Sequence, residues 1–532
     1  HHDLRRTARR PEARMSHVRV AIIGAGFAGI GAAIALRDSG ERDFLILERA
    51  ESVGGTWRDN RYPGVACDVP SHLYSYSFLP NPDWSGVFAS GGEIHEYLES
   101  AVHTEGLEEH LRLNTAMTGL DWDDEWAVWR IATSGGSYTA DAVILAAGRL
   151  TEPRIPELPG IETFRGELFH SARWRDDVEL AGKRVAVIGT GASAVQLVPR
   201  LADAVRAGEA EGSVTVFQRS APWIVPRPDR DYTDAERAEF SADPTAIERL
   251  RSAQFWEGEA MFAARAGDPA AVADARTEAL EHLERQVPDP ALRALLTPDY
   301  EIGCKRRLIS SDYYPALSSG AVALEASALA SIDRGVLVAA NGARHEADVI
   351  VFATGFESTE QPYATLIRGV GGTTLAEHWR RGMTAFASTS VHGFPNLFVI
   401  NGPNAGLGHN SAVYMIETQL QYVLGALGHL DEFGGVLDVT ARAERAYTRM
   451  IDRMAAPTVW LTGGCDSWYV DPRSGRLTLL WPGSAHEFRE RNGVFDPEPY
   501  RHPASPVPAP QSTPRKKETH VAPHPLRVQG VR

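Results

Sequence analysis

Residues 164–194, FRGELFHSARWRDDVELAGKRVAVIGTGASA, form the stretch that decides the fold of this chain. Its second half predicts a short apolar strand, Arg184–Ile188, followed directly by a glycine turn and the start of a helix in residues 189–194. The glycines of such a turn let the backbone approach a pyrophosphate, and the first N–H groups of the helix are free to bind it. The stretch therefore predicts a dinucleotide site.

A second stretch of the same kind opens the chain. Residues 19–23 predict a strand, the turn GAGFAG follows in residues 24–29, and an Ala-rich helix comes next. Phe44–Leu47 predicts the next strand, and Glu48 stands at its end. A carboxylate there accepts hydrogen bonds from a ribose 2′-hydroxyl, whereas the neighbouring acidic residues fit ordinary loop charges. Two dinucleotide sites in one chain indicate that two nucleotides meet.

The charged residue that follows the second predicted strand of each unit is acidic in the first unit and basic in the second unit. In the second unit the predicted strand Ser213–Phe217 is followed by Gln218, Arg219 and Ser220. A guanidinium suits a 2′-phosphate, which a carboxylate such as Glu48 would repel. The second site therefore predicts NADPH rather than NADH, and the alternative is an ordinary surface arginine.

Composition and charge restrict the other classes of function. The chain has 532 residues and a formal net charge of −15, which argues against a general binder of nucleic acid or of anionic membranes. The cysteines Cys67, Cys304 and Cys465 lie far apart in sequence, so we expect no CxxC redox pair, no metal site and no disulfide framework. This usage is typical of a reducing compartment and favours a cytoplasmic protein.

Two near-copies of one strand indicate how the domains connect. DAVILAAG (residues 141–148) and DVIVFATG (residues 348–355) are apolar and end in small residues, which lets a crossover pass close to a nucleotide. The doubling predicts an α/β fold with two dinucleotide-binding, Rossmann-like domains, one inserted in the other. The predicted ranges are 1–14 for a disordered or non-native lead, 15–150 and 375–502 for the first domain, 151–222 and 300–374 for the second domain, 223–299 for a helical insertion, and 503–532 for a disordered tail.

The segment 233–296 differs from its surroundings, because it is charged, Ala-rich and helical in pattern. Thr233 with Glu236 and Thr245 with Glu248 fit capping boxes at two helix starts. Three large apolar side chains are expected in helix packing rather than in a pocket, namely Trp256, Met261 and Phe262. Further on, residues 394–419 predict a strand, a glycine- and asparagine-rich loop and a helix that begins near Asn410 or Ser411.

A glycine- and aromatic-rich loop follows the first unit. The sequence GGTW (residues 54–57) leads into RDNRYPGVACD (residues 58–68), and its glycines and proline predict a structured loop. The aromatic residues of this loop fit core packing, and Asp68 fits a helix cap or a turn as well as a functional site. In the same way, the three cations at 305–307 fit a solvated basic turn as well as a binding site.

Taken together, these motifs resemble the class B flavoprotein monooxygenases, and most closely the Baeyer–Villiger monooxygenases. The resemblance covers residues 19–500 and rests on two patterns of this family. The first, GGxW followed by YPGxxxD, is complete in residues 54–68, and the second, FxGxxxHxxxW, is complete in residues 164–174. Trp174 favours the Baeyer–Villiger branch, whereas Arg175 departs from the Pro or Asp that usually follows this tryptophan.

The resemblance implies bound FAD in the first domain, NADPH in the inserted second domain, and a role for particular residues. The implied FAD residues are Gly24, Gly26, Phe27, Ala28, Gly29, Glu48, Gly55, Thr56, Trp57, Asp68 and Tyr74. The implied NADPH residues are Gly189, Thr190, Gly191, Ala192, Ser193, Ala194, Arg219, Ser220, Lys305 and Arg306. Arg306 matches the catalytic arginine of the family, and Asp68 matches the acidic residue that positions it. His170 and Trp174 match the second pattern, in which the histidine is linked to domain movement.

The reaction implied by the resemblance is insertion of one oxygen atom from O2 next to a ketone carbonyl, through C4a-peroxyflavin, to give an ester or lactone. The implied partners are O2 and a small-molecule ketone or sulfide, without nucleic acid or membrane, for a monomer or weak homo-oligomer. The alternative is a flavin-containing monooxygenase that oxidises sulfur or nitrogen. The missing CxxC argues against a flavin disulfide reductase, and the two family patterns argue against a non-enzymatic nucleotide sensor.

Overall fold

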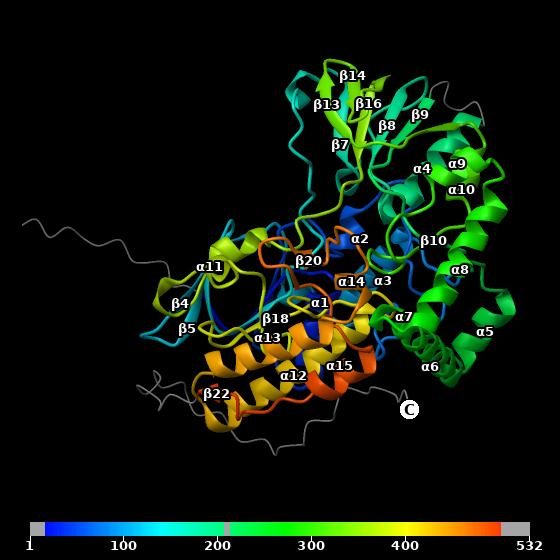
Figure 1. Cartoon of the computed structure of the whole chain (residues 1–532). Helices are drawn as coiled ribbons and strands as arrows, with labels where there is room; N and C mark the ends of the chain where they lie inside the picture. Colours follow the sequence, from blue (N-terminus) through cyan, green and yellow to red (C-terminus); the bar gives the residue numbers. More distant parts are fainter. Residues whose placement is uncertain (1–15, 207–212, 502–532) are drawn as a thin grey trace, which may run out of the picture.

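Two β-sheets in separate lobes organise the structure (Figure 1). The computed structural model describes residues 16–206 and 213–501. The segments 1–14 and 503–532, which the sequence predicts to be disordered, lie outside the described residues. In the described ranges, no helix combines the length and the apolar character needed to cross a membrane.

The first sheet has the strand order β17-β4-β5-β6-β1-β2-β3, and β18 pairs with β6 beside this path. Val20 of β1 lies between Phe44 of β2 and Ala142 of β6 in parallel register. These central strands are buried, as apolar runs in a parallel sheet covered on both faces should be. The strands are β1 (Ser16–Ile23), β2 (Phe44–Leu47), β3 (Leu111–Arg112), β4 (Met117–Asp123), β5 (Val128–Thr133), β6 (Gly136–Leu145), β17 (Ile367–Arg368) and β18 (Leu397–Val399).

The second sheet has the order β12-β9-β8-β16-β7, and all its pairings are parallel. Its strands are β7 (Glu167–His170), β8 (Arg184–Ile188), β9 (Ser213–Phe217), β12 (Val322–Glu325) and β16 (Val349–Phe352). A separate antiparallel sheet consists of β13 (Leu329–Asp333), β14 (Val336–Ala339) and β15 (Arg344–Glu346). Because the second sheet comes between β6 and β17 in the chain, the predicted α/β fold with one Rossmann-like unit inserted in the other is confirmed. The domain boundaries stay predictions.

The two units repeat one local geometry at their glycine turns. Gly24 has a φ of +105°, and a Cβ on it would lie 2.5 Å from the carbonyl oxygen of Ala146. Gly189 has a φ of +114°, and its Cβ would lie 2.5 Å from the carbonyl oxygen of Ala353. Only glycine combines this backbone conformation with so close an approach. Each turn is therefore packed against the end of one of the two near-copied strands, β6 and β16.

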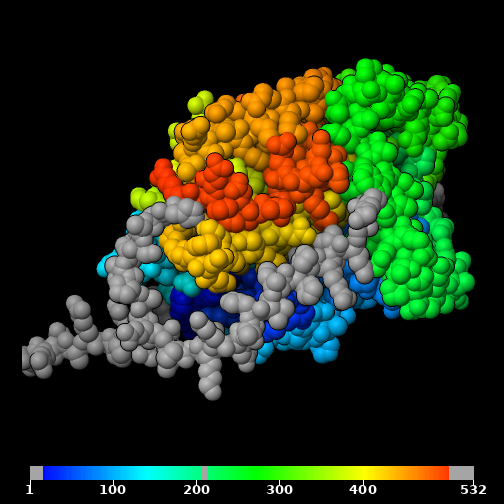
Figure 2. Space-filling model, turned by 90° about the horizontal axis from the view of Figure 1, so that it is seen from below, coloured from blue at the N-terminus to red at the C-terminus, as the bar shows by residue number. Residues whose placement is uncertain are grey.

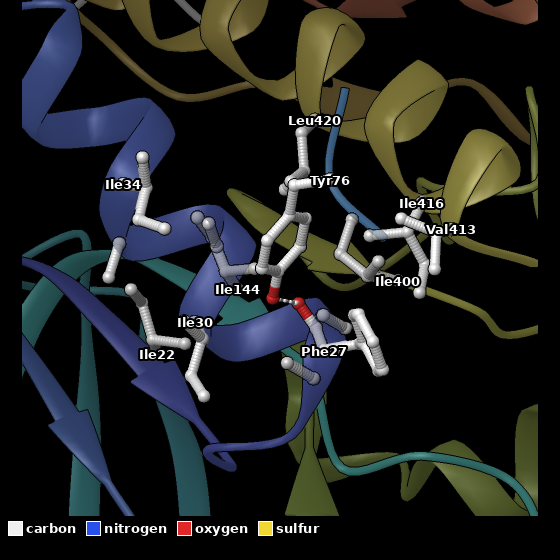
Figure 3. Packing of buried hydrophobic residues seen from close by; sticks show 14 of the residues in the cluster. Ile22, Phe27, Ile30, Ile34, Tyr76, Ile144, Ile400, Val413, Ile416 and Leu420 are labelled. Carbon is white, nitrogen blue, oxygen red and sulfur yellow. Dashed lines mark hydrogen bonds between the residues drawn. The ribbon is translucent and has the colours of Figure 1, made fainter. Parts of the chain in front are cut away.

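The core of the first unit is built around α1 (Phe27–Asp38) and α12 (Ala412–Phe433), with α3 (Gly91–Thr104) beside them. The hydroxyl of Tyr76 donates a hydrogen bond of 2.6 Å to the carbonyl oxygen of Phe27, and Figure 3 shows this ring between α1 and α12. A Cβ on Gly31 would lie 3.0 Å from the ring of Tyr76 and 3.3 Å from Leu420. A small residue in α1 thus lets this tyrosine and α12 close over the first glycine turn.

A row of helices on one side of the molecule forms the predicted helical insertion (Figure 1). These are α5 (Asp234–Ala242), α6 (Pro244–Ala260), α7 (Phe262–Ala266), α8 (Pro269–Gln286) and α9 (Pro290–Leu295). The capping box of Thr233 and Glu236 is confirmed at the start of α5. The second predicted box is wrong, because α6 begins earlier and Asp243 caps it by accepting from the backbone N–H of Thr245.

The large apolar side chains of the insertion divide between core and surface. Phe262 packs against a cluster of buried apolar residues in the first unit, as expected. Trp256 and Met261 are 40% and 36% exposed, so the expectation that they lie in helix packing is wrong. Figure 2 shows the insertion, in green, beside the C-terminal face that contains α12, α13 (Ala441–Ala455) and α15 (Ala485–Asn492).

The remaining elements are short, apart from helix α4. The helices are α2 (Thr56–Asp59), α4 (Ala192–Arg206), α10 (Tyr313–Ser318), α11 (Leu375–His378), α14 (Val459–Thr462), η1 (Glu108–His110), η2 (Ile161–Thr163), η3 (Ser171–Arg173), η4 (Pro362–Leu366) and η5 (Val370–Gly372). The strands are β10 (Ile224–Val225), β11 (Leu308–Ile309), β19 (Asp438–Val439), β20 (Val470–Asp471), β21 (Arg476–Leu477) and β22 (Tyr500–Arg501).

Candidate active site

The first glycine turn forms a cradle with glycines at its points of closest approach. Helix α1 begins after Gly26, which makes no side-chain cap, so its first N–H groups have no side-chain acceptor. Gly55 faces this turn, and a Cβ on Gly55 would lie only 3.1 Å from the Cα of Gly26. Two glycine segments at a helix N-terminus fit a pyrophosphate, because backbone N–H groups and the helix dipole favour an anion. Residues 24–29 and 55–56 are thus in place for FAD.

Glu48 lies beside this cradle. Its side chain is buried, and its Oε2 accepts a hydrogen bond of 2.8 Å from the backbone N–H of Ala25. Its Oε1 accepts a hydrogen bond of 2.9 Å from the backbone N–H of Ala50. The end of β2 therefore brings a fixed carboxylate to the edge of the turn, where a ribose next to the pyrophosphate would lie.

An aromatic cluster borders the same unit. The indole N–H of Trp57 donates a hydrogen bond of 3.3 Å to the hydroxyl of Tyr74. Phe27 contacts Tyr74 edge-on, with ring centroids 5.1 Å apart. Burial raises the pKa of Tyr74 well above its usual value, so this hydroxyl stays neutral and acts as a hydrogen-bonding group. The structure brings these three predicted residues together on one side of the cradle.

The second glycine turn leads into α4 and is open at its tip. A Cβ on Gly191 would have no heavy atom within 4 Å, so the helix N-terminus is accessible to a ligand. The hydroxyl of Thr190 donates a hydrogen bond of 3.1 Å to the carbonyl oxygen of Ser220, which joins the turn to the end of β9. This geometry fits the pyrophosphate of a second dinucleotide.

Two cations lie at the end of β9, next to this turn. Lys305 donates a hydrogen bond of 2.8 Å from its Nζ to the hydroxyl of Ser220, and Arg219 is exposed beside it. Burial, and after it the charge of Arg219, lower the pKa of Lys305. Within the described ranges neither cation has a carboxylate within ion-pair distance. Two cations without an ion-pair partner in these ranges, one of them bound to the hydroxyl of Ser220, fit a doubly charged 2′-phosphate.

Arg306 forms an ion pair with Asp68, as the resemblance implied. Its Nε lies 2.8 Å and its Nη2 lies 2.6 Å from the Oδ2 of Asp68. The charge of Asp68 raises the pKa of Arg306 further above its usual value, so the guanidinium is permanently cationic. The hydroxyl of Tyr469, a buried residue that the sequence did not identify as part of the site, also hydrogen-bonds Arg306.

One glutamine ties the loop that carries Asp68 to the second unit. The hydroxyl of Tyr62 donates a hydrogen bond of 2.7 Å to the Oε1 of Gln196 in α4. The Nε2 of Gln196 donates a hydrogen bond of 2.9 Å to the carbonyl oxygen of Ala66. The loop of the first unit, which carries Asp68, is therefore fixed on the helix that begins at the second glycine turn.

His170 and Trp174 are both held by contacts with neighbouring residues. His170 ends β7 and is 2% exposed, and its Nδ1 accepts a hydrogen bond of 3.1 Å from the backbone N–H of Ala172. Burial lowers the pKa of His170 to about 4, so its imidazole is neutral at neutral pH. Trp174 packs edge-on against Phe169, with ring centroids 5.3 Å apart. The unusual Arg175 forms exposed ion pairs with Glu167 and Asp177, so it is accommodated at the surface.

The expectation of no disulfide framework is wrong for two of the three cysteines. Cys304 and Cys465 form a disulfide across a separation of 161 residues, whereas Cys67 is free and buried. Separation along the chain says nothing about distance in the fold, and the sequence argument relied on it. The bond links the residue before Lys305 to the segment that precedes Tyr469. The cysteines therefore no longer support the inference of a reducing compartment. Among the described residues, no cluster of His, Cys, Asp or Glu is arranged to hold a metal ion.

Replacing Cys465 by serine is expected to lower the thermal unfolding temperature under oxidising conditions. A disulfide that closes so long a loop stabilises a protein by about 2 to 4 kcal/mol, mainly by restricting the unfolded chain. Dithiothreitol should lower the unfolding temperature of the parent protein towards that of Cys465→Ser. The control is Cys67→Ser, which should keep the response to the reductant. An unfolding temperature that is the same with and without reductant in the parent protein would contradict the bond.

Comparison with known proteins agrees with this geometry. Residues 21–239 match the family described as pyridine nucleotide-disulphide oxidoreductase. A Baeyer-Villiger monooxygenase of Streptomyces coelicolor is 48% identical over 488 residues, which cover 91% of this chain and 92% of the relative. The closed crystal structure of cyclohexanone monooxygenase is similar with a TM-score of 0.79 at 30% identity, covering 90% of this chain and 96% of that one. A crystal structure of OTEMO in complex with FAD and NADP has a TM-score of 0.78 at 27% identity, covering 90% of this chain and 97% of that one.

The similarity extends over both nucleotide-binding units and the helical insertion, and is not confined to a shared Rossmann-like unit. The relative from Streptomyces coelicolor matches almost from end to end, and the two solved structures have the same overall fold. Arg306 and Asp68, which the resemblance links, form an ion pair. The chain belongs to the Baeyer–Villiger monooxygenase family of flavoproteins, which use FAD and NADPH.

Proposed function

We propose that this chain inserts one oxygen atom from O2 between the carbonyl carbon and a neighbouring carbon of a small-molecule ketone, giving an ester or lactone. The observation that carries this proposal is the ion pair of Arg306 and Asp68, which joins the second unit to the loop of the first unit that Gln196 also holds. A permanent cation at the meeting point of two cofactor sites suits a reaction that develops negative charge on oxygen. A cytoplasmic location and a monomeric or weakly associating state remain predictions from the sequence.

The cofactors supply hydride transfer and oxygen activation, and the chain supplies binding and electrostatics. FAD would be held by the cradle of residues 24–29 and 55–56, with Glu48 on its ribose. NADPH would be held by the turn at 189–194, with Arg219 and Lys305 around its 2′-phosphate. The hydrogen bonds of Gln196 would keep the two sites in register, because this one side chain contacts both units.

Arg306 would stabilise the oxyanion that forms when the ketone carbonyl is attacked. Its guanidinium keeps its charge throughout, and charge-assisted hydrogen bonds to oxyanions are among the strongest in proteins. Asp68 orients this group, because its Oδ2 accepts a hydrogen bond from Nε and lies 2.6 Å from Nη2. Tyr469, which is 2% exposed, also interacts with Arg306.

The experiment that tests the function is NADPH oxidation by the purified holoenzyme with cyclic, linear and aryl ketones, followed by mass spectrometry of the products. We expect ketone-stimulated NADPH and O2 consumption and a product that is heavier by one oxygen atom. Sulfides and tertiary amines form the second arm of the panel. Oxidation of sulfur or nitrogen without any ester would support a flavin-containing monooxygenase instead and would overturn the proposal.

Replacing Lys305 by alanine is expected to raise the KM for NADPH by about 10- to 100-fold, because a charge-assisted hydrogen bond contributes about 1.5 to 3 kcal/mol. The KM for NADH should change little, since NADH has no 2′-phosphate. Both values are measured from the rate of flavin reduction. Lys183→Ala, which removes an exposed lysine before β8, is the matched control and should change neither value. An equal loss with both nucleotides would show that Lys305 does not bind the 2′-phosphate.

A further inference from the structure

We propose that the preferred ketone of this site carries an anionic group, which we assign to a carboxylate, and that Arg149 and Arg265 bind this group. The inference rests on the proposed function, because it concerns the substrate of the same site. It names the chemical class of the substrate as a keto acid. Two buried or half-buried guanidiniums that have no carboxylate partner are the observation behind it.

Arg149 follows the strand-to-loop crossover at the end of β6. Its Nη1 makes one long hydrogen bond of 3.3 Å to the carbonyl oxygen of Leu479. The guanidinium lies against Gly406, where a Cβ would be 2.0 Å from Nη1 and 2.5 Å from the central carbon, so only glycine leaves room for it. In the part of the chain that the structure describes, no carboxylate lies within ion-pair distance of Arg149. Its charge has no counter-ion from the protein.

Arg265 approaches the same loop from helix α7 of the insertion. It is 8% exposed and donates hydrogen bonds of 2.7 Å to the carbonyl oxygen of Met261 and 2.9 Å to that of Gly408. Among the described residues its guanidinium donates only to these neutral carbonyl oxygens, and no carboxylate forms an ion pair with it. Burial lowers the pKa of Arg265 to about 9, which still leaves it charged at neutral pH. Its neighbour Arg307, in contrast, is 3.2 Å from the carboxylate of Glu278.

The two arginines contact one short loop next to the catalytic arginine. They lie against Gly406 and Gly408, whose Cα atoms are at most about 7 Å apart because they are two residues apart in the chain. Burial raises the pKa of Tyr469, and the charges of Arg306, Arg149 and Arg265 each oppose this shift, so all three guanidiniums lie near this residue. Asp68 is the only carboxylate that forms an ion pair with any of these three among the described residues.

An excess of buried positive charge is costly unless an anion compensates it. The phosphates of the two cofactors do not require these arginines, because the glycine turns, Arg219 and Lys305 are in place for them. A neutral ketone would leave both charges uncompensated beside the carbonyl. A keto acid would place its carboxylate at the 406–408 loop and its ketone next to Arg306. The carboxylate of such a substrate would thus compensate the positive charge of Arg149 and Arg265.

The test compares keto acids of increasing chain length with their methyl esters, using the holoenzyme and its Arg149→Gln and Arg265→Gln variants. Each pair has the same carbon skeleton and the same ketone, and differs in charge. We expect the parent enzyme to favour the best acid over its ester by about 10- to 100-fold in kcat/KM, as a charge-assisted hydrogen bond of about 1.5 to 3 kcal/mol gives. Arg149→Gln should remove most of this preference, while kcat/KM for the ester changes less than about threefold.

Two controls separate recognition of the carboxylate from a structural role. Arg149→Lys should recover part of the preference, and Arg154→Gln, which removes an exposed arginine from the following connector, should keep all of it. Dissociation constants of acid and ester, measured by the change in flavin absorbance of the oxidised holoenzyme, should show the same difference without turnover.

A parent enzyme that oxygenates the esters as well as the acids would overturn this inference and leave the proposed function intact. Absence of any oxygenated product from every ketone would overturn both, and an equal loss with acid and ester in Arg149→Gln would assign the arginine to structure alone.

Discussion

Replacing Arg306 by alanine is expected to abolish ester formation while leaving FAD bound. The guanidinium pairs with Asp68 at 2.6 Å and is permanently charged, so alanine removes the only catalytic cation that the site holds in place with a carboxylate. Loss of one preorganised group that stabilises an oxyanion costs about 10²- to 10³-fold in kcat, or about 2.7 to 4 kcal/mol. The measurement is the rate of ester formation, followed by mass spectrometry under saturating ketone and NADPH.

The same variant separates chemistry from cofactor binding. Flavin reduction by NADPH, observed as bleaching of the yellow colour without oxygen, should persist in part, because the glycine turn, Lys305 and Arg219 remain. The matched control is Arg307→Ala, which removes the next cation along the chain, one that pairs with Glu278. Ester formation at the parent rate in Arg306→Ala would remove this residue from the mechanism.

Replacing Gly29 by alanine is expected to give a protein without FAD. A Cβ at this position would lie 1.8 Å from the carbonyl oxygen of Gly24, far inside the contact distance of any pair of heavy atoms. Because the neighbouring atom is backbone, the glycine turn and the start of α1 have to separate. The first N–H groups of the helix then no longer point into the cradle, and FAD affinity should fall by more than about 100-fold, since several charge-assisted hydrogen bonds are lost together.

The ratio of flavin to protein absorbance after purification measures this effect directly. Gly428→Ala is the matched control, because Gly428 lies in helix α12 of the same unit and a Cβ there has open space. That variant should keep its full content of FAD and gain slightly in stability, as alanine favours a helix. A yellow Gly29→Ala protein with one flavin per chain would show that the cradle is not the FAD site.

The sequence predicted those parts of the fold that depend on local patterns. The strands Phe44–Leu47, Arg184–Ile188 and Ser213–Phe217 have the predicted bounds, because short apolar runs limited by glycine or charged residues identify buried strands. Helix α12 begins after Ser411, one of the two predicted starts, since a serine cap is a local signal. The glycine turns also followed from motifs, whereas the pair of Arg306 and Asp68 was implied only by the resemblance to the family.

The features that the sequence missed all depend on contacts between distant segments. Cys304 and Cys465 meet although they are 161 residues apart, and no local pattern marks such a pair. Tyr469 directly precedes the short strand β20, and its contact with Arg306 depends on how this segment is placed in the fold. Arg149 and Arg265 carried no signal, because an arginine after a strand or within a charged helix is usually solvated. Their missing counter-ions are visible only when every neighbour is placed.

The most direct test of the central claim follows oxygen itself. Purified holoenzyme is incubated with NADPH, a ketone that it accepts and oxygen-18 gas, and the product is analysed by mass spectrometry. The proposed function predicts an ester or lactone that carries one heavy oxygen atom, formed in equal amount to the NADPH consumed. Recovery of unchanged ketone, with the NADPH consumed and only hydrogen peroxide formed, would contradict it.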